Sequence, residues 1–169
     1  MNRPAFLLVL GTAFLACSLA AFPLQAAETV PDDARVLQGI REARGVFDIT
    51  RSRPDTLLGT LKLVAETREG LLHQGVKPDL IVLFRGPAVT LLTTENKGLD
   101  SDERKQLEAI GQQIHSLQKA GVRFSVCSIA TRTFKVDNRH LLPGLEPVGN
   151  VLISLMALQQ KGYALVPLY

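Results

Sequence analysis

Apolar residues recur with the spacing of an α-helix in three segments of the chain. In residues 55–73 they gather mostly on one helical face, and Pro54 suits the first helical position. A second helix is predicted to start at Asp100, because Asp100 and Glu103 have the spacing of a capping box. The third is predicted over about residues 150–161.

Short apolar runs follow these helices and predict β-strands. Residues 79–84 are apolar on both faces, which is typical of a central parallel strand. Residues 122–127 alternate strictly between apolar and polar, as expected for a strand with two different faces. Further strands are predicted at residues 45–50, 145–148 and 163–166.

The order of these elements indicates the fold class. The chain runs helix, glycine, strand at Gly75, Gly121 and Gly162. Such alternation predicts an α/β fold with a mainly parallel five-stranded sheet and helices on both faces. Residues 30–44 predict a short leading helix, and Pro167 is compatible with a strand at the sheet edge. Binding and catalytic sites in such sheets form at the carboxyl ends of the strands.

The first 26 residues have the pattern of an export signal. Arg3 is their only charged residue, a long apolar run follows it, and small residues surround a cleavage site after Ala26 or Ala27. An uncleaved membrane anchor and a lipoprotein attached through Cys17 are the alternatives. We expect a periplasmic protein without stable membrane insertion after cleavage, in which residues 27–169 form a single domain and Cys127 is the one remaining cysteine.

Composition and motifs exclude several functions. The full chain has 19 Lys and Arg against 16 Asp and Glu, a small positive surplus that gives no reason to expect nucleic acid as a partner. The glycine-rich phosphate-binding loops and the Gly-x-Ser-x-Gly elbow are missing from the sequence. The three histidines are isolated, without metal-ligand spacing. We therefore expect neither a cofactor nor a metal ion.

Cys127 is the first candidate for chemistry. It ends a predicted strand and Ser128 opens a predicted short helix, so backbone N–H groups and the helix dipole would favour its thiolate. Four residues that follow closely would add positive potential: Arg132, Lys135, Arg139 and His140. The alternative is a buried cysteine that packs as a small hydrophobic residue.

Arg85, Gly86 and Asn150 are candidate binding residues. Arg85 interrupts an apolar strand at its carboxyl end, and Gly86 after it permits close approach of a ligand to the backbone. A solvent-facing arginine is the alternative. Asn150 stands at the predicted start of the third helix, where its structural role is that of an N-cap.

The sequence resembles the DsrE/DsrF-like family. The segment 119–127, which ends in Cys127, is similar to that family's cysteine-bearing segment, and residues 85–89, 141–148 and 158–164 are similar to its other motifs. The resemblance covers about residues 45–169. It implies a flavodoxin-like three-layer sandwich, usually assembled as a homo- or hetero-oligomer. It also implies that Cys127 matches the cysteine that carries sulfur as a persulfide in the sulfur-relay members.

Three hypotheses about function follow. In the first, Cys127 takes up a sulfane sulfur from a donor protein or small sulfur compound and passes it on, with Arg85 stabilising the anionic sulfur. In the second, the residues around Arg85 and Cys127 form a non-catalytic module that binds a small anion or a partner's tail. In the third, the chain is an assembly protein and Cys127 is merely buried. An exported protein would differ from the sulfur-relay members of the family, which work in the cytoplasm.

Overall fold

The computed structural model describes residues 31–95 and 100–169, of which Asp32–Tyr169 form one compact unit. The export segment predicted over residues 1–26 lies outside the described residues. Within the described ranges, no helix combines the length and the apolar character needed to cross a membrane.

Five parallel strands form one sheet. In chain order they are β1 (Glu42–Ile49), β2 (Lys77–Phe84), β3 (Arg123–Cys127), β4 (Glu146–Val148) and β5 (Ala164–Leu168). Their spatial order is β4-β3-β2-β1-β5, and every neighbouring pair is parallel. The predicted α/β class with helices on both sides of the sheet is therefore confirmed. Pro167 lies in β5, an edge strand, as predicted.

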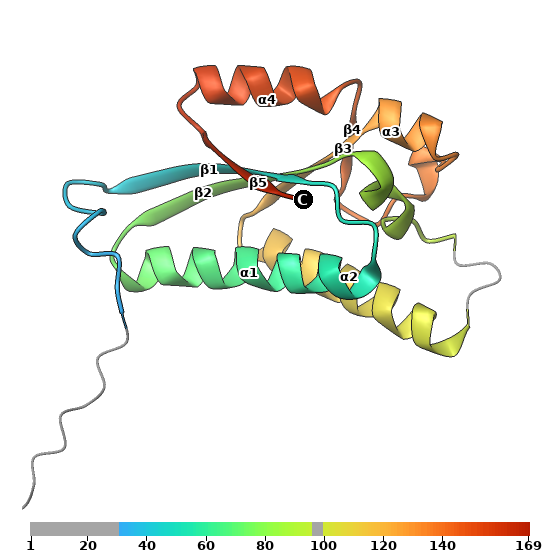
Figure 1. Cartoon of the computed structure of the whole chain (residues 1–169), viewed down its shortest axis with the longest axis horizontal. Coiled ribbons are helices and arrows are strands. Elements are labelled where there is room, and N and C mark those ends of the chain that lie inside the picture. Colours follow the sequence, from blue (N-terminus) through green and yellow to red (C-terminus); the bar gives the residue numbers. More distant parts are fainter. Residues whose placement is uncertain (1–30, 96–99) are drawn as a thin grey trace, which may run out of the picture. The chain divides into compact units, whose positions relative to one another are not determined.

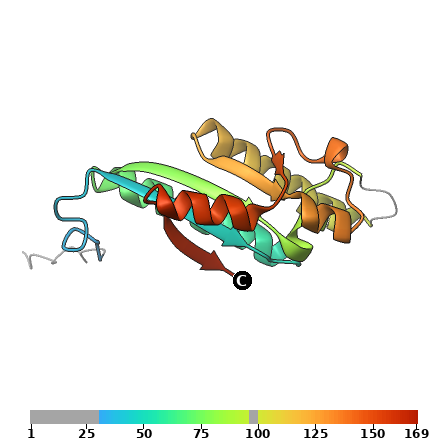
Figure 2. The same ribbon diagram turned by 90° about the horizontal axis from the view of Figure 1, so that it is seen from above.

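Helices cover both faces of this sheet unequally. The long helices α1 (Pro54–His73) and α2 (Ser101–Lys119) lie side by side on one face, and α3 (Ser128–Thr133) and α4 (Val151–Gln160) lie on the other (Figure 1). The chain returns from the β4 edge to the β5 edge through α4, which crosses above the middle of the sheet (Figure 2). The connections from β1 to β4 run across the sheet in one direction, and the connection from β4 to β5 runs back in the other. A right-handed connection that runs back has to lie on the opposite face of the sheet from α1 and α2.

The core forms where the apolar face of each helix meets the sheet. Helix α1 buries Leu57, Leu61 and Val64 completely, and α2 buries its own row of Ile110, Ile114 and Leu117. Both rows have the spacing of one helical face. The interior residues of β2 are also buried, as the apolar run of residues 79–84 predicted.

Local capping signals are formed as predicted. The Asp100 side chain accepts hydrogen bonds from the N–H groups of Asp102 and Glu103, both at 2.8 Å. The Glu103 side chain in turn accepts from the Asp100 N–H group, which completes the capping box. These groups satisfy N–H donors that a helix leaves free at its start.

The leading helix predicted over residues 30–44 is wrong. Its described part forms turns, in which the N–H groups of Val36 and Leu37 both donate to the Asp33 carbonyl, and β1 begins at Glu42. Val36 in this segment is 76% exposed, so it contributes little packing that could hold a helix. A short helix without a packing partner is marginal in water.

Candidate functional site

A cavity of about 290 Å³ lies at the carboxyl ends of β2 and β3. All four residues that the sequence singled out line it: Arg85, Gly86, Cys127 and Asn150. They come from the end of β2, the start of a 3-10 helix, the end of β3 and the start of α4. Neighbouring parallel strands bring their carboxyl ends to the same edge, so residues distant in the sequence meet there.

Cys127 is the last residue of β3 and is 5% exposed. Phe124 and Val126 are buried on the other side of the strand, which leaves Arg123, Ser125 and Cys127 on the side that carries α4. Helix α3 begins at the next residue, as the sequence predicted. The thiol is thus buried in the fold and yet forms part of a cavity wall.

The cavity wall is largely apolar. Three of its lining side chains are among the exposed large hydrophobic residues of the molecule: Ile129 at 42%, Phe134 at 40% and Leu152 at 49% exposed. They come from α3, its carboxyl end and α4. A water-exposed apolar rim around a partly buried polar centre is typical of a surface that binds something.

Arg85 is held by a buried carboxylate. Its Nε and Nη2 atoms donate to the two Asp48 oxygens, each at 2.8 Å, while the Asp48 side chain is 3% exposed and the Arg85 side chain 32% exposed. The Tyr169 hydroxyl donates to the same carboxylate at 3.4 Å, and the Arg85 guanidinium lies 5.7 Å from the Tyr169 ring centroid. Hydrogen bonding to Asp48 raises the pKa of Arg85 above its ordinary value.

Arg85 is therefore not the solvent-facing arginine of the alternative interpretation. Sequence reasoning missed Asp48 as its partner, although a signal was present, because a single acid within the apolar strand that contains Val46, Phe47 and Ile49 needs a cation or hydrogen-bond donors once buried. Nothing in the sequence indicated Tyr169. Tyr169 directly follows β5, which lies beside β1 only in the folded sheet.

Gly86 and Asn150 shape the cavity through the backbone. Gly86 has φ of +57°, a left-handed conformation that other residues rarely adopt, and it turns the chain from Arg85 into a 3-10 helix (Gly86–Leu91). The Asn150 side-chain oxygen accepts from the Leu152 N–H group at 3.0 Å, so Asn150 is the predicted N-cap of α4 and also a lining residue.

The four further residues from which the sequence predicted positive potential are not part of the cavity wall. None of Arg132, Lys135, Arg139 and His140 lines it. Arg139 is paired with Asp137, and His140 Nδ1 lies 3.1 Å from a Glu95 oxygen. Among the described residues, Arg85 is the one cation in the cavity wall. The same part of the chain contains no cluster of three or more His, Cys, Asp or Glu side chains that could hold a metal ion.

Fold and site together define a flavodoxin-like α/β sandwich with a cysteine at the carboxyl end of a sheet strand. Residues 45–168 match the DsrE/DsrF-like family, and the chain belongs to this family. An uncharacterised protein of Aquifex aeolicus is 28% identical over 125 residues, which are 73% of this chain and 55% of that relative. The matched segment thus spans about half the length of that relative.

Two solved structures share the fold. A protein of unknown function from Methanobacterium thermoautotrophicum, MTH1491, superposes with a TM-score of 0.60 at 21% identity, covering 75% of this chain and 99% of its own. The ychN protein of E. coli has a TM-score of 0.51 at 19% identity, with the same coverage. At these identities the similarity shows the fold alone.

Proposed function

We propose that this protein is an exported, periplasmic sulfur carrier in which Cys127 holds the transferred sulfur as a persulfide. The single observation that supports this most is the cavity whose lining residues include both Cys127 and Arg85. The family membership points in the same direction, and the apolar leader of residues 1–26 supports export.

The transfer step needs no cofactor. The Cys127 thiolate attacks the outer sulfur of a donor R–S–SH, a new S–S bond forms, and the donor's S–S bond breaks. The electron pair of that bond leaves with the thiolate R–S⁻, so the products are Cys127–S–SH and R–S⁻. A second thiolate that attacks the outer sulfur of Cys127–S–SH delivers it onward and regenerates Cys127.

In this proposal, Arg85 stabilises the negative sulfur. Asp48 engages Nε and one N–H of Nη2, and among the described residues no acceptor is recorded for Nη1. A charge-assisted hydrogen bond from Nη1 would stabilise the sulfur anion by about 1.5–3 kcal/mol. Asp48 is then a positioning residue, since it fixes the guanidinium plane without touching the sulfur.

Mass spectrometry of the intact protein tests the proposal. The chain carries Cys17→Ser, so that Cys127 is its one thiol, and is treated with inorganic polysulfide. We expect the mass to increase by one sulfur atom, and Cys127→Ser to show no increase. Arg85→Gln should slow the reaction by about 10- to 100-fold, whereas Arg85→Lys keeps the charge and should slow the reaction less. A free thiol that gains no sulfur would contradict the proposal.

A second candidate function rests on the exposed rim of Ile129, Phe134 and Leu152. In that case the cavity holds the apolar tail of a partner, Arg85 binds an anionic group at its end, and Cys127 is structural. The same assay separates the two, because a structural cysteine takes up no sulfur and reacts with alkylating reagents only after unfolding.

A further inference from the structure

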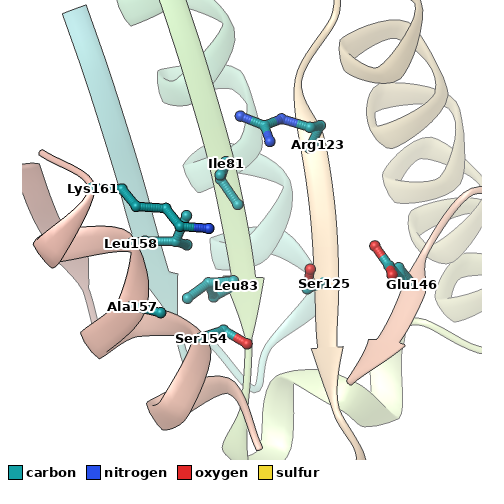
Figure 3. A pocket seen from close by; sticks show the side chains of 9 residues that line it. All are labelled: Ile81, Leu83, Arg123, Ser125, Glu146, Ser154, Ala157, Leu158 and Lys161. Carbon is teal, nitrogen blue, oxygen red and sulfur yellow. The ribbon is translucent and has the colours of Figure 1, made fainter. Parts of the chain in front are cut away.

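A second cavity, of about 310 Å³, lies on the α4 side of the sheet. Figure 3 shows it between α4 and β4, with Ile81 and Leu83 of β2 as its apolar floor. Five polar side chains surround the floor: Arg123 and Ser125 of β3, Glu146 of β4, Ser154 of α4, and Lys161 directly after α4.

The cavity exists because one helix cannot cover five strands. Strands lie about 4.8 Å apart, and a helix with its side chains is about 10 Å wide. Helix α4 lies over the middle of the sheet and α3 lies near the strand ends (Figure 2), and residues of β3 and β4 beside α4 line the cavity. On β3 and β4 the chain has the polar residues Ser125 and Glu146 at this cavity, whereas the neighbouring strand β2 has the apolar residues Ile81 and Leu83.

Several of the polar groups have unused hydrogen-bonding capacity. Within the described residues, no hydrogen bond or ion pair is recorded for the side chains of Ser125, Glu146, Ser154 and Lys161. Arg123 is anchored, since its Nη2 donates to Asp79 and to the Tyr163 hydroxyl, and Tyr163 donates to Asp79 at 2.6 Å. Its Nη1 and Nε atoms remain for another acceptor.

The charges are separated across the cavity. Figure 3 shows Lys161 on the α4 side and Glu146 on the β4 side, with Arg123 at one end of the cavity. Ser125, two residues from Arg123 on β3, is the register partner of Glu146 on β4, so the backbones of Arg123 and Glu146 lie about 8 Å apart. A zwitterion of dipeptide or tripeptide size matches this separation, whereas the charges of a single amino acid are too close together.

The two cavities follow each other along the same elements. The second cavity has Leu83, Ser125 and Ser154 in its wall. The first has Arg85, Cys127 and Leu152, each two residues away on the same three stretches of chain. On β3, two residues correspond to about 6.6 Å, and Ser125 and Cys127 face the same side. A peptide bound in the second cavity thus has the Cys127 thiol within reach of a short side chain.

We propose that the second cavity binds a low-molecular-weight peptide thiol and that its persulfide is the donor for Cys127, an inference that rests on the proposed sulfur-carrier function. Carboxylates of the peptide pair with Lys161 and Arg123, its ammonium group pairs with Glu146, and the hydroxyls of Ser125 and Ser154 bind the peptide groups. The Cys127 thiolate attacks the outer sulfur of the peptide persulfide, and the peptide leaves as its thiolate.

The test uses the tripeptide glutathione as a probe, with Lys161→Gln as the variant and Lys62→Gln as the control, because Lys62 is an exposed lysine of α1. Calorimetry should show that Lys161→Gln weakens glutathione binding at least fivefold, while Lys62→Gln changes it less than twofold. Ser154→Ala, at an independent position in the cavity, should weaken it in the same direction. Circular dichroism checks that each variant is folded.

Sulfur transfer then separates this inference from the function on which it rests. With glutathione persulfide as donor, Lys161→Gln should slow sulfur uptake at least fivefold, while uptake from inorganic polysulfide stays within twofold of the unchanged protein. If glutathione does not bind, or Lys161→Gln affects both donors equally, the peptide site is wrong and the carrier function stands. If no donor loads Cys127, the carrier function fails and the donor role fails with it.

Discussion

The Asp48–Arg85 pair gives the sharpest prediction about stability, because its two members differ in exposure. The Asp48 side chain is 3% exposed and the Arg85 side chain 32% exposed. Arg85→Gln leaves a buried carboxylate without its cation, and the Tyr169 hydroxyl at 3.4 Å remains as its partner there. Asp48→Asn leaves a guanidinium that water can reach. The first change should therefore cost more than the second.

The magnitudes follow from the geometry. Removing one partner of a fully buried ion pair costs about 3–5 kcal/mol, and the partial exposure of Arg85 lowers this to about 2–3 kcal/mol for Arg85→Gln. Asp48→Asn loses charge-assisted hydrogen bonds to a group that can be rehydrated, for a cost of about 1–2 kcal/mol. In the double variant no buried charge is left alone, so adding Asp48→Asn to Arg85→Gln should restore about 1 kcal/mol.

Urea unfolding at neutral pH of the unchanged protein, the two single variants and the double variant measures these differences in free energy of unfolding. The slope of this free energy against urea concentration checks that the unfolded states are comparable. The reasoning is refuted if the two single losses simply add in the double variant. It is also refuted if Asp48→Asn costs more than Arg85→Gln, because the buried carboxylate would then not be the sensitive partner.

Four further predictions concern other parts of the chain. Asp100→Ala removes the N-cap bonds of α2 and should lower the free energy of unfolding by about 1 kcal/mol in urea titrations, with Asp102→Ala as a smaller control. Burial alone would raise the pKa of Asp79, but hydrogen bonds from Tyr163 and Arg123 outweigh it and hold that pKa below its ordinary value of 3.8. Its contribution to stability is therefore present above about pH 4 and is lost as the pH falls through the lower folded-state value, and Tyr163→Phe should make this acid loss smaller. Helix α4 exposes large apolar residues, among them Ile153 at 62% and Met156 at 58%, which predicts that the protein forms an oligomer. Light scattering should show this oligomer, and Met156→Glu should weaken it. A monomer mass at micromolar concentration would contradict the prediction. Intact mass of exported protein should show a chain that starts at Ala27 or Glu28, whereas full-length protein found only in membranes would refute cleavage.

The sequence by itself determined the order and type of the strands and main helices. Periodicity marks α1 and α2, the Asp100 and Glu103 spacing marks the start of α2, and Asn150 marks the start of α4. These signals are local, since a cap or an apolar face depends on residues within one or two helical turns. The same locality explains the failure at residues 30–44, where apolar residues such as Val36 and Ile40 stay largely exposed and give a helix little to pack against.

In the candidate site, too, some features could be predicted from the sequence and others depend on the tertiary structure. Arg85, Gly86 and Cys127 could be singled out because each lies at or just after the carboxyl end of a predicted strand, and parallel strands end at one edge of a sheet. Only the tertiary structure decided that Asp48 holds Arg85, that Tyr169 joins them, and that polar residues of β3, β4 and α4 surround a second cavity. These contacts depend on which strands are neighbours, and the spatial order β4-β3-β2-β1-β5 results from packing between segments that are distant in the sequence.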